Sequence, residues 1–206
     1  MTKSAIIILI RNPILGRVKT RLAADIGDFN ALTVYKTLLS YTRKITNSIN
    51  SSRLLFYSDY IDFNDDWEDK IYKKYVQSGT DFGEKMLNAF KIALTNHNLA
   101  VIIGSDCLEL DSKIINLAFK KLKEFDVIIG PAKDGGYYLM GLKKVYPQLF
   151  QDKNWSTDSV LSETINTIKD LGLTLHLLSL LGDIDTLQDL KTSKLYKKLD
   201  LKVDIT

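Results

Sequence analysis

The chain has 206 residues, of which 45% are hydrophobic and 26% charged, a composition typical of a globular protein with a sizeable core. Its net charge of +3 comes from scattered lysines and arginines, which argues against a nucleic-acid-binding protein. Cys107 is the only cysteine, so no internal disulfide can form. Because neither a signal peptide nor an apolar run of about 20 residues is found, we expect a cytoplasmic protein without a membrane span.

In chain order, the hydrophobic pattern predicts strands that alternate with helices. Strands are expected at 5–10, 53–57, 99–104, 126–130, 137–141 and 173–178, and helices at 31–49, 82–95, 111–124, 156–171 and from Leu187. The segment 67–75 fits a short helix followed by a strand, and the strand at 137–141 is a candidate for an antiparallel neighbour. Such alternation is typical of an α/β fold with three α/β/α layers and a mostly parallel, Rossmann-like sheet, here a single domain over 1–206.

The predicted ends of the helices rest on individual residues. Asp111 is a suitable N-cap, as is Ser156 or Thr157 for the helix at 156–171. Gly172 suits the position just after that helix, where a left-handed backbone is common.

Two predicted strands run directly into acidic residues. The strand at 99–104 is followed by Asp106, and the strand at 126–130 is followed by Asp134. Open α/β sheets bind ligands at the carboxyl ends of their strands, so Asp106 is the strongest candidate ligand for Mg²⁺ or Mn²⁺. The alternative is that Asp106 only caps the next helix and that 134–136 is an ordinary turn.

An acid-x-acid pair, Asp183 and Asp185, follows the last predicted strand. Both are candidate metal ligands. We expect at most one of the two carboxylates to face the site, unless the loop bends.

A basic loop follows the first strand. Arg17, Lys19 and Arg21 lie within five residues, and Gly16 lets the backbone approach a ligand. These cations suit a polyphosphate, although a solvated basic turn is the alternative. Neither the Walker A pattern nor the G-x-G-x-x-G fingerprint is present.

The segment after the strand at 126–130 suits the substrate side of a site. Gly135 and Gly136 allow a tight loop, and Asp134 can accept from a sugar or base hydroxyl. Tyr137 and Tyr138 offer either a stacking face or core packing.

Taken in order, these motifs resemble a bacterial family of small GT-A-fold proteins described as nucleotide-diphospho-sugar transferase-like or glycosyltransferase-like. The family is similar to phospholactate guanylyltransferase and to the molybdenum-cofactor nucleotidylyltransferases. The resemblance rests on the segments 11–22, 104–107, 130–142, 155–157 and 183–186.

The resemblance implies a role for each matching residue. Gly16, Arg17, Lys19 and Arg21 would hold the phosphates of the nucleotide, and Asp134, Gly135, Gly136 and Tyr137 would line the substrate side. Asp106 would be the metal-binding acid, with Asp183 or Asp185 as a second acidic position. Lys19 and Asp106 are the candidate catalytic residues.

We therefore expect a transferase that depends on Mg²⁺ or Mn²⁺ and uses a nucleotide-activated donor. Its partners would be an NDP-sugar or a nucleoside triphosphate and a small-molecule acceptor. The family favours glycosyl transfer, whereas the three cations of the first loop suit nucleotidyl transfer with release of pyrophosphate. A non-catalytic nucleotide-binding module is the third alternative, and the oligomeric state stays open.

Overall fold

The computed structural model describes residues 3–197, so the two ends of the predicted domain, 1–2 and 198–206, lie outside the described residues. The strands are β1 (Ser4–Ile10), β2 (Ser52–Tyr57), β3 (Tyr72–Val76), β4 (Leu99–Ile103), β5 (Val127–Pro131), β6 (Tyr137–Leu142) and β7 (Leu175–Leu177). The α-helices are α1 (Thr20–Ile26), α2 (Asp28–Asn47), α3 (Phe82–Asn96), α4 (Ser112–Lys121), α5 (Val160–Asp170) and α6 (Leu187–Thr192), with a 3₁₀ turn at Pro147–Leu149.

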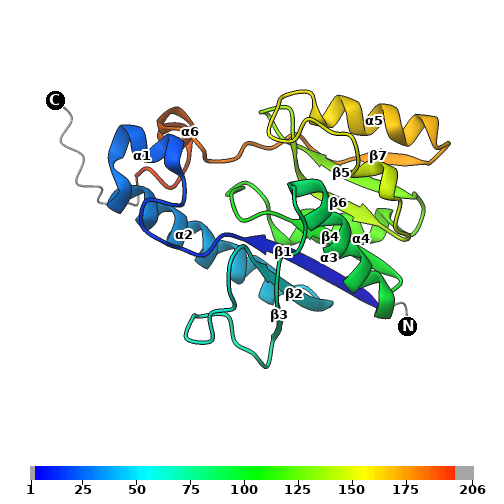
Figure 1. Ribbon diagram of the computed structural model, residues 1–206, viewed down its shortest axis with the longest axis horizontal. Helices are drawn as coiled ribbons and strands as arrows, with labels where there is room; N and C mark the ends of the chain where they lie inside the picture. Colours follow the sequence, from blue (N-terminus) through cyan, green and yellow to red (C-terminus); the bar gives the residue numbers. More distant parts are fainter. Residues whose placement is uncertain (1–2, 198–206) are drawn as a thin grey trace.

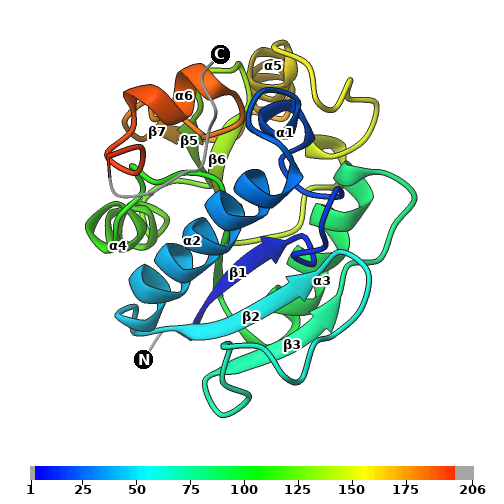
Figure 2. The same ribbon diagram turned by 90° about the vertical axis from the view of Figure 1, so that its left-hand side faces the viewer.

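The strands form one sheet in the order β3-β2-β1-β4-β6-β5-β7 (Figures 1 and 2). All neighbours pair in parallel except β6, which runs antiparallel to both β4 and β5. The short 132–136 turn between β5 and β6 explains this, because a parallel connection needs a crossover of a dozen or more residues. The carboxyl ends of the six remaining strands therefore meet at one edge, and the predicted α/β class is confirmed.

Helices cover both faces of the sheet. In β1, Ile6, Ile8 and Ile10 pack in a cluster with α2 and α4, whereas Ala5 and Ile7 pack in a second cluster with α3 and α5. Successive side chains of a strand point to opposite faces, so a continuously apolar strand implies two covered faces. A third apolar cluster joins α1, the start of α2 and α6 beside the sheet (Figure 1).

Two sequence predictions of local structure are confirmed by capping contacts. The Asp111 carboxylate accepts from the N–H of Ile114 at 2.9 Å, as an N-cap does. Gly172 adopts a φ of 64° and donates to the Lys169 carbonyl, which closes α5.

Three local predictions need correction. Helix α5 begins at Val160 rather than at 156, because Ser156 has a φ of 67° and Thr157 caps a turn at the Asn154 carbonyl instead. Segment 67–75 holds a turn before β3 and no helix, and the last strand shortens to Leu175–Leu177.

Of the helices within residues 3–197, none is long and apolar enough to cross a membrane.

Candidate functional site

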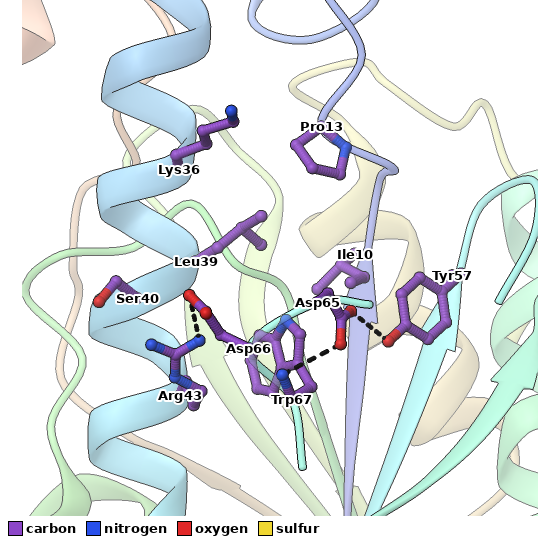
Figure 3. A pocket seen from close by; sticks show the side chains of 10 residues that line it. All are labelled: Ile10, Pro13, Lys36, Leu39, Ser40, Arg43, Tyr57, Asp65, Asp66 and Trp67. Carbon is purple, nitrogen blue, oxygen red and sulfur yellow. Dashed lines mark hydrogen bonds and ion pairs between the residues drawn. The ribbon is translucent and has the colours of Figure 1, made fainter. Parts of the chain in front are cut away.

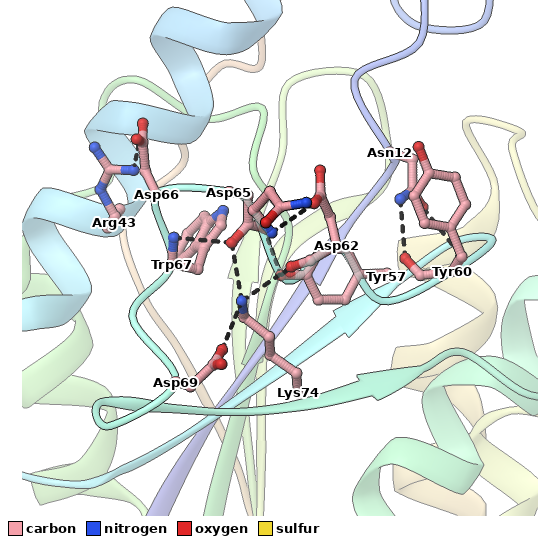
Figure 4. A network of polar contacts seen from close by, with 11 residues as sticks. Asn12, Arg43, Tyr57, Tyr60, Asp62, Asp65, Asp66, Trp67, Asp69 and Lys74 are labelled. Carbon is pink, nitrogen blue, oxygen red and sulfur yellow. Dashed lines mark hydrogen bonds and ion pairs between the residues drawn. The ribbon is translucent and has the colours of Figure 1, made fainter.

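The loop between β1 and α1 is anchored by buried polar groups that the sequence analysis did not single out. The Tyr35 hydroxyl accepts from the N–H of Arg11 at 2.8 Å and donates to its carbonyl at 3.1 Å. Asn12, which is 2% exposed, donates to the Tyr60 carbonyl at 2.9 Å and accepts from the N–H of Asp59 (Figure 4). These contacts fix the path of the loop from its first residues. In the sequence, the asparagine directly before a proline is the pattern that could have indicated this anchored loop.

The loop ends at Lys19, whose side chain is only 4% exposed. Its ammonium lies 2.9 Å from Asp106 Oδ1 and 2.7 Å from Asp185 Oδ1. Burial by itself lowers the pKa of Lys19, but the two carboxylates outweigh burial and raise the pKa above its ordinary value. Lys19 is therefore a cation at neutral pH. The backbone of Lys19 is left-handed, with a φ of 50°, which is uncommon outside glycine.

A third carboxylate, Asp183, completes what we call the acidic corner: Lys19, Asp106, Asp183 and Asp185. Burial, and then the negative charges of Asp106 and Asp134, raise the pKa of Asp183 to about 7. Its Oδ1 is buried and has no hydrogen-bond donor among the described residues. A buried carboxylate oxygen without a donor is costly, and either a proton or a bound cation at this position would lower that cost.

The sequence led us to expect at most one of Asp183 and Asp185 at the site, unless the loop bends; both lie at the acidic corner. Asp185 contacts Lys19, and Asp183 lies close enough to Asp106 and Asp185 for their charges to raise its pKa. Residues two apart in an extended segment share a face, while Ile184 between them is buried in the third cluster. The loop is also fixed to the other acidic loop, because the N–H of Ile184 donates to the Asp106 carbonyl at 3.1 Å.

The acidic corner offers carboxylates to an ion such as Mg²⁺ or Mn²⁺. Within residues 3–197, no three acidic, histidine or cysteine side chains form a complete metal-binding group. Mg²⁺, however, commonly takes one or two protein carboxylates and completes its shell with water and substrate phosphates. Asp106 and Asp185 are 42% and 43% exposed, and Asp183 offers an unpaired oxygen. These residues fit such an ion.

The 132–136 turn lies beside the acidic corner. The Asp134 carboxylate accepts from the N–H of Gly136 at 2.9 Å, and its charge contributes to the raised pKa of Asp183. Gly135 has a φ of 88°, and a Cβ there would lie 2.2 Å from the Asp158 carbonyl oxygen. A glycine is therefore required where this turn packs against the segment before α5.

The two tyrosines after the turn point into the protein. The Tyr137 hydroxyl lies 3.9 Å from the sulfur of Met86, in the second apolar cluster. Tyr138 is 4% exposed and donates to the Ser179 carbonyl at 2.9 Å. The structure thus brings Asp134 to the acidic corner and packs Tyr137 against the core.

The other two predicted basic residues are exposed: Arg17 lies in the loop, and Arg21 lies in the first turn of α1. Gly16 has a φ of 73°, and Arg17 and Arg21 form no ion pair within residues 3–197. Both arginines are therefore available to an anion, whereas Lys19 is already held by carboxylates.

Sequence analysis missed the turn between β3 and α3, at the same edge of the sheet. The Gln77 amide donates to the carbonyls of Ile10 and Phe56, and Asp81 caps α3 at the N–H of Glu84. Gly83 leaves room for Trp155, because a Cβ there would lie 2.6 Å from the indole nitrogen. In the sequence, two glycines on either side of an acidic N-cap, shortly after a strand, are the pattern that could have indicated this turn.

A second buried lysine lies on the other side of β1 from the acidic corner. Lys74 is 5% exposed and contacts Asp65 at 2.9 Å and Asp69 at 2.8 Å. Asp65 also accepts from the Tyr57 hydroxyl and from the N–H of Trp67 (Figure 4). We call these residues, Lys74, Asp65, Asp69, Tyr57 and Trp67, the Lys74 network.

The Lys74 network borders a hollow of about 310 Å³ between α2 and the 65–67 segment (Figure 3). Arg43 and Asp66 face each other across its rim at 2.8 Å, and Ile10, Pro13 and Leu39 supply apolar walls. Asp65 in its lining is paired with Lys74, so two of its acidic side chains already have a cationic partner.

Solved structures share this fold. A candidate nucleotide-diphospho-sugar transferase from Desulfovibrio desulfuricans G20 is 27% identical, with a TM-score of 0.86 over 96% of this chain and 88% of that one. The inositol-1-phosphate CTP transferase from T. maritima is 15% identical, with a TM-score of 0.60 over 96% and 95%. A Mycobacterium tuberculosis H37Rv protein in complex with manganese is 10% identical, with a TM-score of 0.54 over 93% and 97%.

These neighbours confirm the GT-A-like fold that the sequence motifs suggested, and the first two are named as transferases. Comparison with curated protein sequences finds no significant match. A family model matches residues 42–157, which is more than half of the chain. The protein belongs to the family described as "Uncharacterized protein conserved in bacteria (DUF2064)".

Proposed function

We propose that the protein is a metal-dependent transferase that uses a nucleotide-activated donor, with an NDP-sugar as the leading donor class. The observation that carries the proposal is the acidic corner, where a buried lysine and three carboxylates from three different loops meet at the carboxyl edge of the sheet. Such an edge is where open α/β sheets bind nucleotides.

The cations of the first loop suit the phosphates of the donor. Arg17 and Arg21 are exposed and unpaired within residues 3–197, and Lys19 lies at the end of the same loop. Guanidinium groups bind phosphate oxygens through two parallel hydrogen bonds, which fixes orientation as well as charge. Gly16 lets the backbone of this loop approach the diphosphate.

Asp106 and Asp183 are the residues that would hold Mg²⁺ or Mn²⁺, with Asp185 beside them. The ion would neutralise charge that develops on the departing phosphate. The protein with 27% identity is named for the same donor class, and another neighbour was solved in complex with manganese.

In the proposed reaction, an oxygen of the acceptor forms a bond to the anomeric carbon of the sugar. The bond from that carbon to the β-phosphate oxygen breaks, and its electron pair leaves with the nucleoside diphosphate. The acceptor loses its proton to solvent or to a carboxylate. Lys19 would stabilise the negative charge on the leaving diphosphate, and Asp134 would contact the sugar or the acceptor from the 132–136 turn.

Nucleotidyl transfer is the second candidate. In that reaction the acceptor attacks the α-phosphate of a nucleoside triphosphate, and pyrophosphate leaves. The T. maritima neighbour, which aligns along nearly its whole length, is named a CTP transferase. The cations Arg17, Lys19 and Arg21, at the end of the loop and the start of α1, also suit a triphosphate. The two candidates share the site and differ in the bond that breaks.

Thermal unfolding in the presence of ligands tests the proposal. A panel of nucleoside triphosphates and NDP-sugars is measured with and without Mn²⁺, because a ligand at about 100 times its Kd adds roughly 2.7 kcal/mol. We expect a shift that requires both Mn²⁺ and a nucleotide, and that is lost in Asp106→Asn. The absence of any metal-dependent shift would refute both enzyme reactions, and a shift without turnover would favour the non-catalytic alternative.

Product analysis then separates the two reactions. Release of a nucleoside diphosphate from an NDP-sugar supports glycosyl transfer, and release of pyrophosphate from a triphosphate supports nucleotidyl transfer.

A further inference from the structure

We propose that Lys19 is a resident counter-ion of the site, which exchanges with the divalent cation: it neutralises Asp106 and Asp185 when the metal is absent and is released to an anionic ligand when the metal binds. The proposal deepens the proposed function, on which the identity of the anionic ligand rests. The exchange itself concerns only the chain, a divalent cation and a phosphate-containing anion.

The first argument is the position of the ammonium. Lys19 reaches both loops at once, and the two oxygens that it contacts, Asp106 Oδ1 and Asp185 Oδ1, lie at 2.9 and 2.7 Å. A divalent cation that binds these carboxylates, through the same or the second oxygen of each, lies close to the ammonium of Lys19. The two positive charges repel each other, and the repulsion is strong where the site is partly buried.

The second argument is the charge balance. One ammonium faces two carboxylates, Asp106 and Asp185, and the buried Oδ1 of Asp183 has no donor within residues 3–197. A single positive charge therefore leaves the site short of compensation. A divalent cation matches the excess better, so exchange is favoured once such an ion is present.

The third argument is the backbone of Lys19. Its φ of 50° is a left-handed conformation that costs a side-chain-bearing residue free energy. In this conformation the side chain reaches both Asp106 and Asp185. When a metal ion replaces these ion pairs, the residue is able to relax and to turn its ammonium toward an anion bound beside Arg17 and Arg21.

The exchange predicts a reciprocal coupling between two ligands. An anion that receives the released ammonium favours the metal-bound state, and the metal favours binding of the anion by the same factor. Mn²⁺ alone should therefore bind weakly, and Mn²⁺ together with pyrophosphate should bind tightly.

Lysine acetylation of the wild-type protein, read out by mass spectrometry, tests the release directly. We expect Lys19 to react slowly without metal, faster with saturating Mn²⁺, and slowly again with Mn²⁺ and pyrophosphate. Lys74, which is buried between two aspartates to the same degree, is the internal control and should stay slow in all three states. A Lys19 reactivity that Mn²⁺ does not change would overturn the exchange.

Titration calorimetry with Mn²⁺ tests the competition. Lys19→Met should bind Mn²⁺ about tenfold or more tightly than wild type without pyrophosphate, and should lose most of the enhancement that pyrophosphate gives. Lys74→Met is the matched control and should bind Mn²⁺ as wild type does. Equal or weaker binding of Mn²⁺ by Lys19→Met would contradict the proposal.

The two experiments distinguish this inference from the proposed function. If the exchange is observed but no nucleotide binds or turns over, the transferase assignment fails and the exchange stands. If nucleotides turn over while Lys19 stays protected and Lys19→Met binds Mn²⁺ normally, the exchange fails alone. If the Lys19→Met variant does not fold, acetylation of the wild-type chain by itself still tests whether Lys19 is released.

Discussion

Two lysines of this protein are buried in nearly the same way, and the comparison separates a site from a structural contact. Lys19 and Lys74 are 4% and 5% exposed, and each holds two aspartates at 2.7 to 2.9 Å. By contact distance and by exposure of the lysine side chain the two clusters are alike, although Asp65 is less exposed than either aspartate of the acidic corner. The difference lies in what else the carboxylates contact.

In the Lys74 network, uncharged O–H and N–H groups donate further hydrogen bonds to the carboxylate that the lysine contacts. Asp65 accepts from the Tyr57 hydroxyl and from the N–H of Trp67, and Lys74 also donates to the Asp62 carbonyl at 3.0 Å. In the acidic corner, a third carboxylate, that of Asp183, has a buried oxygen without a donor. An excess of buried negative charge, rather than the ion pair itself, is therefore the sign of a ligand site.

The largest expected difference is in activity. Asp106→Asn should lower kcat/KM for transfer by about 100- to 1,000-fold, because it weakens the proposed site of the metal ion that would stabilise negative charge on the departing phosphate. Asp65→Asn, the matched change in the Lys74 network, should leave kcat/KM within about twofold of wild type. Steady-state kinetics of both variants checks this, and an equal loss in the two would erase the distinction between the clusters.

The next effect is on stability. Lys74→Met should lower the free energy of unfolding by about 1–3 kcal/mol, because Asp65 stays buried without its cation, while Asp69 is exposed enough to be solvated. Urea unfolding of the variant measures the loss. An unchanged midpoint would show that the Lys74 network is not structural.

In the acidic corner, by contrast, we expect a substitution to increase the free energy of unfolding. Asp183→Asn should raise the free energy of unfolding of the metal-free protein by about 1–2 kcal/mol, because it removes an uncompensated negative charge beside Asp106 and Asp185. Urea unfolding without metal, at neutral pH, measures the gain. Asp65→Asn serves again as the control and should destabilise; a loss in both variants would contradict the charge-excess argument.

The smallest effect concerns alkaline pH. Burial, and then the hydrogen bond to Asp65, raise the pKa of Tyr57 above its ordinary value. The unfolded chain ionises this tyrosine above about pH 10 and the folded chain does not, so the tyrosine's contribution to stability is present below that pH and is lost above it. Tyr57→Phe should cost about 1 kcal/mol at neutral pH.

The difference between wild type and Tyr57→Phe should shrink above about pH 10. Urea unfolding of both proteins at about pH 8 and pH 11 measures it. A difference that grows with pH would mean that Tyr57 ionises in the folded protein before it does in the unfolded chain.

Much of the fold followed from local patterns in the sequence. Continuous apolar runs marked β1, β2, β4 and β5, since strands covered on both faces need no alternation. The carboxyl ends of these strands placed Asp106 and the basic loop at the same edge. Where local turn chemistry competed with helix propensity, as at Ser156, the helix boundary was predicted too early.

The sequence alone determined most strands of the sheet, the edge at which their carboxyl ends lie and the residue types that gather there, because hydrophobic periodicity and strand ends are local properties of the chain. Only the tertiary structure decided which charges meet. Lys19 and Asp185 are 166 positions apart, and their contact depends on how the loop after β7 folds back onto the loop after β4. Long-range electrostatics of this kind has no local signature, so a basic loop that resembled a ready phosphate site proved to contain a lysine already held by carboxylates.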